Sequence, residues 1–354
     1  MNLTDKALAL VRSDAESVLS SRTELLRPLA GSHIFVSGGT GFLGTWLLEL
    51  IAVLNERHDF RLRVTVFSRK ARAFAAGCPH LGSQPWVRFV DGDIRYLAEL
   101  PRETQYVVHA AALTDRRLFA SHPTAVAETN SLGTLRLLQA ACLLEDVRKI
   151  VVLSSGLTCG TLPRELATVK EDFMGSVRCD DVNAVYAESK RFAEVLAHCA
   201  ISESKLPVVM LRPFAFIGPY QSLQLPWAVT DFLRDSLNGS PIRIMGEGNT
   251  VRSLMYASDY AYWTLAALAR GKARATYNVG SPHPIDLLSL ARMITQHFSP
   301  PPEILTKVGQ SSHETTRLVP CVEKAQRELG VGVTVSLPDA IQKTITWHRT
   351  NSVL

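Results

Sequence analysis

The sequence has 354 residues, of which 46% are hydrophobic and 20% are charged, and its formal net charge is +5. This balance is that of a globular protein with one large domain or two smaller ones. The positive charge is spread along the chain and forms no basic block, which argues against a nucleic-acid-binding protein.

The cysteines and the apolar runs exclude further classes. Six cysteines show no CxxC pair and no Cys/His spacing typical of a metal site, so we expect reduced thiols and no bound metal. No apolar run approaches the ~20 residues that span a bilayer. The first 30 residues lack the apolar stretch of a secretory signal. We therefore expect a cytoplasmic protein with no membrane and no nucleic acid among its partners.

Residues 1–30 alternate apolar and charged side chains, which predicts an N-terminal extension of one or two short amphipathic helices. We expect it to pack on the core or on a second subunit. Residues 31–213 carry the pattern of a dinucleotide-binding domain. Residues 214–354 have shorter, turn-rich segments and are expected to form mainly a smaller substrate-binding lobe, with some segments returning to the first domain.

The stretch from His33 to Asn55 has the pattern of a strand, a tight turn and a helix, with the turn at Gly38-Gly39-Thr40-Gly41-Phe42-Leu43-Gly44. Gly38 can take backbone angles closed to other residues, and Gly41 lets a ligand approach the main chain. Gly44 lets the helix lie close to the strand. The unpaired N–H groups at the helix start form an anion site suited to a pyrophosphate, so the segment predicts dinucleotide binding.

A second strand is predicted from Leu62 to Phe67, and it ends in Ser68-Arg69-Lys70. A carboxylate at this point holds the ribose of NAD, whereas an arginine accommodates the extra phosphate of NADP. No acid is present, and the guanidinium of Arg69 has the shape that binds phosphate. The sequence favours NADP, with NAD as the alternative; a basic turn that only faces solvent also fits.

Three further strands are predicted at Trp86–Val90, Gln105–His109 and Lys149–Leu153, with a helix over Thr124–Leu144 before the last of them. Repeated strand–helix units with nearly continuous apolar strands predict a parallel sheet covered on both faces. The expected fold class is therefore α/β, a doubly wound parallel (Rossmann) sheet with a smaller C-terminal substrate-binding lobe. The small residues Ala110-Ala111-Ala112 leave room for a cofactor across the strand ends.

Tyr186 and Lys190 lie four residues apart in a helix predicted over Val185–Ala200, so they share one face. A free phenol, with a pKa of about 10, is a poor base at pH 7. A nearby ammonium is expected to lower that pKa, so that the pair exchanges a proton with a sugar or alcohol oxygen during hydride transfer. Ser155, at the end of the fifth strand, can hydrogen-bond the same oxygen. We predict Ser155, Tyr186 and Lys190 as catalytic residues.

An ordered set of motifs resembles the extended short-chain dehydrogenases/reductases, and within them the nucleotide-sugar epimerase/dehydratase branch. The motifs are the glycine turn, Asp91-Gly92-Asp93, His109-Ala110-Ala111, Tyr186 with Lys190, Leu211-Arg212-Pro213 and Asn278-Val279-Gly280. The resemblance runs from about His33 to His348. It implies a bound NAD(P), hydride exchange at a ring carbon of a nucleotide-diphosphate sugar, and a homodimer paired through the helices that hold Asn130 and Tyr186.

The resemblance also assigns residues to the two ligands. It implies as cofactor-binding residues Gly38, Thr40, Gly41, Phe42, Leu43, Gly44, Ser68, Arg69, Asp93, Ile94, Ala110, Ala111, Ala112, Asn130, Tyr186, Lys190 and Pro213. It implies as substrate-binding residues Thr114, Ser155, Gly156, Leu157 and Arg252, the last at the position of a diphosphate-binding arginine. For Asn130, a purely structural role at the helix start fits equally well.

The chain departs from this branch directly after the fifth strand. In the 4,6-dehydratases an Asp and a Glu follow the Ser/Thr and carry the elimination, whereas Gly156 and Leu157 stand here, and Cys159 replaces a usual Tyr. Decarboxylating members also tend to keep the Glu. An apolar side chain cannot shuttle a proton, so a 4-epimerase or a 4-keto-sugar reductase is expected. The alternatives are a dehydratase with unusual acid/base residues, a carbonyl reductase of a non-sugar metabolite, and a non-enzymatic dinucleotide-sensing protein.

Overall fold

The computed structural model describes residues 3–20, 22–163, 165–176, 179–306 and 316–351. Its centre is a seven-stranded sheet in the order β11-β6-β5-β4-β1-β2-β3, in which every neighbouring pair is parallel. The strands are β1 (His33–Ser37), β2 (Arg63–Ser68), β3 (Val87–Asp91), β4 (Tyr106–His109), β5 (Lys149–Leu153), β6 (Val208–Pro213) and β11 (Thr276–Val279). The predicted doubly wound class is confirmed, and each of the first five strands lies within one residue of its expected start.

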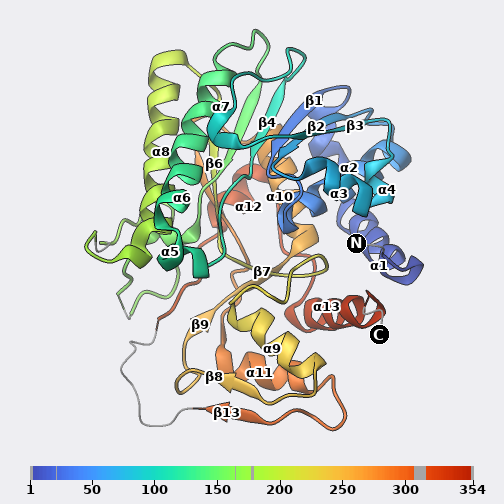
Figure 1. The fold of residues 1–354 in the computed structure, drawn as a ribbon, viewed down its shortest axis with the longest axis vertical. Helices are drawn as coiled ribbons and strands as arrows, with labels where there is room; N and C mark the ends of the chain where they lie inside the picture. The colour runs from blue at the N-terminus through green and yellow to red at the C-terminus, as the bar shows by residue number, and fades with distance from the viewer. Residues whose placement is uncertain (1–2, 21, 164, 177–178, 307–315, 352–354) are drawn as a thin grey trace.

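Helices cover both faces of this sheet (Figure 1). The side chains of α2 (Phe42–His58) and α10 (Ala257–Arg270) enter one hydrophobic core, and those of α7 (Gly133–Ala141) and α8 (Val185–Ser204) enter the second. Such three-layer packing explains why the central strands are apolar on both faces.

The N-terminal extension forms α1 (Asp5–Leu19) and a 3-10 helix (Thr23–Leu29). Figure 1 shows α1 outside α2 and near the C-terminal helix α13 (Leu337–Asn351). Every residue of α2 from Gly44 to Leu54 is buried, and a helix that is apolar all round needs cover on its outer side. The extension supplies that cover.

The chain after β6 forms a smaller lobe, drawn below the main sheet in Figure 1. Among the described residues after β6, those of the lobe form three two-stranded sheets and two helices, whereas α10 packs on the main sheet and strand β11 joins its edge beside β6. The elements of the lobe are β7 (Ala215–Ile217), α9 (Ala228–Leu237), β8 (Ile242–Ile244), β9 (Val251–Arg252), β10 (Leu254–Tyr256), β12 (Ile285–Asp286), α11 (Leu287–Thr295) and β13 (Ile304–Thr306).

The remaining helices are short: α3 (Ala71–Gly77), α4 (Pro79–Gly82), α5 (Arg117–Ser121), α6 (Pro123–Ala127) and α12 (Glu323–Leu329). The single helix expected over Thr124–Leu144 is instead three segments, α6, a π-helical turn (Glu128–Leu132) and α7. Single π turns of this kind are frequent at functional sites, and this one contains Asn130. None of the helices in the described ranges has the length and hydrophobicity that a membrane span requires.

The attachment of α1 gives a first prediction. Asp14 is 3% exposed and accepts hydrogen bonds from the Tyr256 hydroxyl (2.6 Å) and from Lys343 Nζ (2.5 Å). Asp14→Ala should lower the free energy of unfolding by about 2 kcal/mol, because a buried hydroxyl loses its acceptor. Glu16→Ala, on the same helix but in half-exposed ion pairs, should change it by about 0.5 kcal/mol or less. Guanidinium unfolding curves measure both, and equal losses would contradict the prediction.

Candidate active site at the carboxyl ends of the strands

The strand order reverses between β4 and β1, so the ends of these two strands border a crevice at the switch point of the sheet. The glycine turn follows β1, and Ala110-Ala111-Ala112 follows β4. The Gly38 N–H donates to Phe67 O (2.8 Å) at the end of β2, and the Ala110 N–H donates to Ser37 O (3.0 Å). The turn is therefore tied to both neighbouring strands.

Three glycines of the turn have different spatial constraints. Gly38 has a φ of +71°, and a Cβ on it would lie 2.6 Å from the Ala111 nitrogen. A Cβ on Gly44 would lie 2.5 Å from Gly39 Cα, so α2 packs directly on the turn. At Gly41 the nearest atom to such a Cβ is Gly38 O, at 3.4 Å, and the residue is exposed. The chain itself therefore needs Gly38 and Gly44, while the open side at Gly41 fits the approach of a pyrophosphate.

The first turn of α2 faces the same opening. Gly41 is its N-cap, with Phe42 and Leu43 next in the chain, and N–H groups at this position have no partner within the helix. Thr40 Oγ1 lies 2.9 Å from Ser68 Oγ, which joins the turn to the end of β2. These groups form the cradle that the sequence analysis predicts for a dinucleotide.

The end of β2 carries the exposed Arg69, and its charge acts on Asp93 after β3. The pKa of Asp93 is lowered chiefly by hydrogen bonds from Arg95, and Arg69 adds to this effect. Ile94 is buried against Gly133, the first residue of α7, where an added Cβ would lie only 2.7 Å from the Ile94 side chain. Asp93 thus has a partner of its own, while Arg69 remains at the surface of the predicted cofactor site.

A buried polar chain connects the end of β4 with the helix that holds Tyr186. His109 lies 2.7 Å from Ser37 Oγ and 3.0 Å from Thr134 Oγ1, and Thr134 donates to the carbonyl of Asn130. The Asn130 amide donates to Ser189 Oγ (2.9 Å), while its Oδ1 is buried without a hydrogen-bond partner. Burial lowers the pKa of His109 to about 3, so the imidazole is neutral in this chain.

The three predicted catalytic residues come together from β5 and α8. Ser155 follows β5 and hydrogen-bonds Tyr186, and its Oγ also accepts from the Leu157 N–H (3.1 Å). Lys190 Nζ donates to Leu153 O (2.8 Å) at the end of the same strand. All three side chains are at least nine-tenths buried.

The pKa of Tyr186 differs from the expectation that Lys190 lowers it. Burial raises the pKa of Tyr186 to about 12, and only the hydrogen bond with Ser155 opposes this shift. Burial also lowers the pKa of Lys190 to about 8. The ammonium donates to the Leu153 carbonyl, and burial is the largest influence on the pKa of both groups, opposed at Lys190 by the charge of Glu194.

Phe214 covers the position after Ser155. A Cβ on Gly156 would lie 2.8 Å from the ring of Phe214, which follows the end of β6 at Pro213. Leu157 is 39% exposed, whereas Cys159 is 2% exposed, and burial raises the pKa of its thiol to about 11. Cys159 is therefore a core residue, and Leu157 is the side chain of this segment that projects outward.

Arg252, on β9 in the smaller lobe, donates to Val251 O (2.8 Å), Thr316 O (3.0 Å) and Thr316 Oγ1 (3.0 Å). Its pKa is lowered by burial and by the charge of Arg116, which lies after β4. No carboxylate within the described ranges pairs with either guanidinium. Two cations close enough for one to lower the pKa of the other favour the binding of an anion near both.

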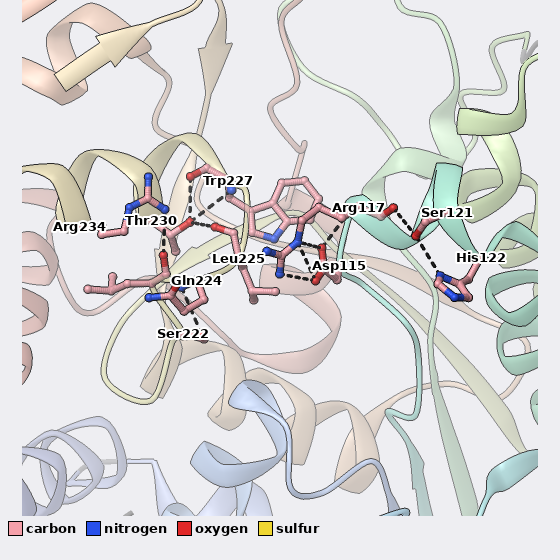
Figure 2. A network of polar contacts seen from close by, with 11 residues as sticks. Asp115, Arg117, Ser121, His122, Ser222, Gln224, Leu225, Trp227, Thr230 and Arg234 are labelled. Atoms are coloured by element: carbon pink, nitrogen blue, oxygen red, sulfur yellow. Dashed lines mark hydrogen bonds and ion pairs between the residues drawn. The ribbon is translucent and has the colours of Figure 1, made fainter.

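The loop between β4 and α5 provides the other side of this region. Thr114 is exposed there, and Asp115 forms an ion pair of 2.6 Å with Arg117. The neighbouring Arg116 has no such aspartate partner in the part of the chain that the structure describes. Figure 2 shows the Asp115–Arg117 ion pair together with the start of α9, where Thr230 Oγ1 accepts from the Trp227 N–H and donates to the Trp227 carbonyl. Thr114 in this loop is one of the substrate-binding residues expected from the sequence, whereas Arg116 is not among them.

The sequence analysis also missed Phe119 of α5, whose ring stacks on that of Tyr186. The chain around Phe119 has no clear apolar period, because α5 is only five residues long. A short apolar pair, Leu118-Phe119, was the only available signal.

Comparison with known proteins agrees with this geometry. The model of the NAD dependent epimerase/dehydratase family matches residues 34–280. The chain is 24% identical over 351 residues to UDP-glucuronic acid decarboxylase 1 of Xenopus tropicalis, which covers 98% of this chain and 80% of that protein. The Bordetella bronchiseptica enzyme WbmF, solved with NAD+ and UDP, superposes with a TM-score of 0.73 and 26% identity, covering 92% and 94% of the two chains.

A third similar protein is a dehydratase. DesIV from Streptomyces venezuelae, a dTDP-glucose 4,6-dehydratase solved with NAD, superposes with a TM-score of 0.76 at 25% identity, covering 90% of this chain and 97% of its own. The family model extends over the glycine turn, the helix that holds Tyr186 and Lys190, and β11 of the main sheet. This protein therefore belongs to the NAD dependent epimerase/dehydratase family.

Proposed function

We propose that this protein is an NAD(P)-dependent oxidoreductase or epimerase that acts at a ring carbon of a nucleotide-diphosphate sugar. The observation that carries the proposal is that Ser155, Tyr186 and Lys190 meet at the end of β5, on the same edge of the parallel sheet as the glycine cradle. The relatives support the substrate class, since their names include UDP-glucuronic acid decarboxylase and dTDP-glucose 4,6-dehydratase. A 4-epimerase or a 4-keto-sugar reductase fits the residues best.

Each residue has a defined role in this proposal. NAD(P) supplies or accepts the hydride. Tyr186 exchanges a proton with the substrate oxygen, and Ser155 hydrogen-bonds both groups. Lys190 lies one turn further along α8 and donates to Leu153 O, and its charge would stabilise a phenolate that forms during the reaction.

Gly156 and Leu157 argue against the elimination that dehydratases perform. An aspartate at position 156 would have to displace the ring of Phe214, whose atoms lie 2.8 Å from the site of its Cβ. Leu157 has no ionisable group, so the segment after β5 offers neither the acid nor the base of an elimination. This favours simple hydride transfer at the 4-position.

Arg252 and Arg116 are proposed to hold the diphosphate of the substrate. An anion between them would relieve the repulsion that lowers the pKa of Arg252 and would replace the water lost on burial. A non-sugar carbonyl substrate without a diphosphate would leave both guanidiniums unused. The pair therefore distinguishes these two substrate classes.

The cofactor is proposed to be NADP rather than NAD, because β2 is followed by Arg69 and not by an acidic residue. The structures with NADH or NAD+ that this chain resembles belong to other proteins and leave that preference open to test.

We also propose a homodimer that pairs through α8, on whose outer side Phe192 and Val195 are 53% and 52% exposed. Two large apolar side chains exposed on one helix face support this position for the proposed interface.

The principal experiment incubates the protein with UDP-, dTDP-, GDP- and CDP-sugars and their 4-keto forms, and follows NAD(P)H absorbance and product stereochemistry. Oxidation of NADPH with a keto-sugar and no epimer indicates a reductase. Epimer formation without net change in absorbance indicates an epimerase. If Tyr186→Phe retains the cellular function, the protein is a dinucleotide sensor and the proposal is wrong.

Arg252→Leu should raise the KM for a nucleotide sugar about 100-fold, since a charge-assisted contact of about 1.5–3 kcal/mol is lost. Arg116→Gln should raise it about tenfold. Arg136→Gln, an exposed arginine on α7, provides the matched change in net charge and should leave KM unchanged. Unchanged KM in Arg252→Leu would identify a reductase of a non-sugar metabolite.

The glycine cradle gives a prediction that separates binding from stability. Gly41→Val should abolish NADPH and NADH binding in fluorescence titrations and leave the melting temperature within about 2 °C, because a side chain there enters only the ligand's space. Gly44→Ala should instead destabilise the chain by about 1–3 kcal/mol through overpacking against Gly39. Tighter binding of NADH than NADPH by the unaltered protein would refute the NADP preference.

The proposed dimer is tested by Phe192→Glu, which should convert a dimer into a monomer in light scattering coupled to size exclusion, because a buried unpaired charge is placed in the interface. Met245→Glu, at a residue that is 75% exposed in the smaller lobe, should leave the mass unchanged. A monomeric unaltered protein would exclude the homodimer.

A further inference from the structure

Tyr186 does not belong to either of the two large cores that flank the sheet. It lies in a separate small hydrophobic cluster with Phe119 and Val126, which are 5% and 0% exposed. The cluster joins α5, α6 and α8, and the partly buried side chains around it are Leu113, Leu118 and Val185. The structure thus surrounds the reactive phenol with apolar groups from a segment that has no part in the glycine cradle.

The contact between the two rings is well defined. The centroids of Phe119 and Tyr186 are 4.9 Å apart, and the ring planes differ by 12°, so the rings are stacked. Stacked pairs in this distance range contribute about 0.5–1.5 kcal/mol beyond the area they bury. The phenyl ring covers one face of the phenol, and this contact excludes water from that face and restricts rotation of the ring.

Few polar groups offset this apolar surrounding. Ser155 is the hydrogen-bond partner of the Tyr186 hydroxyl, from the segment after β5. On the phenol's own helix, Lys190 donates to Leu153 O, and on α5 the charged Arg117 is held by Asp115. On the π turn next to α6, Glu128 pairs with Arg95. Glu188, also on α8, lies 3.8 Å from Arg191. Burial and the hydrogen bond with Ser155 are the two influences on the pKa of Tyr186, which is about 12.

From this arrangement we infer that Phe119 is a positioning residue for Tyr186, and that its stacked ring shields the phenol from water and directs the hydroxyl at Ser155. The inference rests on the proposed function and deepens it, because a protonated phenol is suited to the reductive direction. In that direction the substrate carbonyl carbon gains the hydride that NAD(P)H supplies, and the carbonyl oxygen takes the proton from Tyr186 Oη. The phenolate left behind then regains a proton from solvent.

The test replaces the flat ring and keeps an apolar side chain, with Phe119→Leu as the variant. Val126→Ala is the matched control, because Val126 belongs to the same cluster but has no ring to stack. The eight tyrosines are labelled with carbon-13 at Cζ, and Tyr186 is assigned by its loss in Tyr186→Phe. Titration of this signal in the substrate-free protein measures the pKa directly and needs no knowledge of the substrate.

We expect Phe119→Leu to lower the pKa of Tyr186 by about one unit, because water reaches the exposed ring face. We expect kcat for reduction to fall about tenfold or more at unchanged KM, because the hydroxyl is less well placed. The rate should also be lost at a pH about one unit lower than in the unaltered protein, since the reductive step needs the protonated phenol. Val126→Ala should shift neither the titration nor the pH profile.

An unchanged Tyr186 titration in Phe119→Leu would overturn the inference, and so would an equal shift in Val126→Ala, which would show a general effect of packing. If Phe119→Leu does not fold, Phe119→Met serves as the apolar variant, judged by the same titration. Failure of the proposed function is seen separately, as activity that survives in Tyr186→Phe, and it leaves the titration result intact.

Discussion

The close approach of two backbone segments at the switch point of the sheet is the constraint on which the rest of the structure depends. A Cβ on Gly38 would lie 2.6 Å from the Ala111 nitrogen, so the turn after β1 can contact the end of β4 only without a side chain. This contact brings the first turn of α2, the end of β2 and the small residues after β4 to one opening. A dinucleotide site follows from that arrangement because the helix start provides free N–H groups.

The reactive side of the site depends on desolvation more than on attraction between charges. Tyr186 and Lys190 are both buried, and burial shifts the pKa of each toward its neutral form, up for the phenol and down for the ammonium. Electrostatic effects are stronger where water is excluded. A negative charge that develops on the Tyr186 oxygen during a reaction would therefore interact strongly with the Lys190 ammonium, even though the neutral phenol interacts little with it.

The two lobes contribute different functions to the site. The parallel sheet presents the glycine turn and the proposed proton-transfer groups at its carboxyl edge, while Arg252 comes from β9 in the smaller lobe. Arg116, on the loop after β4, acts on Arg252 through its charge, so the anion site draws on both lobes. The N-terminal helix takes no part in this chemistry, since it covers the apolar outer side of α2.

The sequence by itself determined the features that depend on local pattern: the glycine turn, the apolar strands, and the helix that carries Tyr186 and Lys190. These follow from spacing along the chain, and the structure places Ser155 beside them at the end of β5. Only the tertiary structure decided the stacking of Phe119 on Tyr186, the position of Phe214 over Gly156, and the interaction of Arg116 with Arg252. Each of these joins residues far apart in the chain, and no local periodicity encodes such a contact, because it depends on how short loops and helices pack around the sheet.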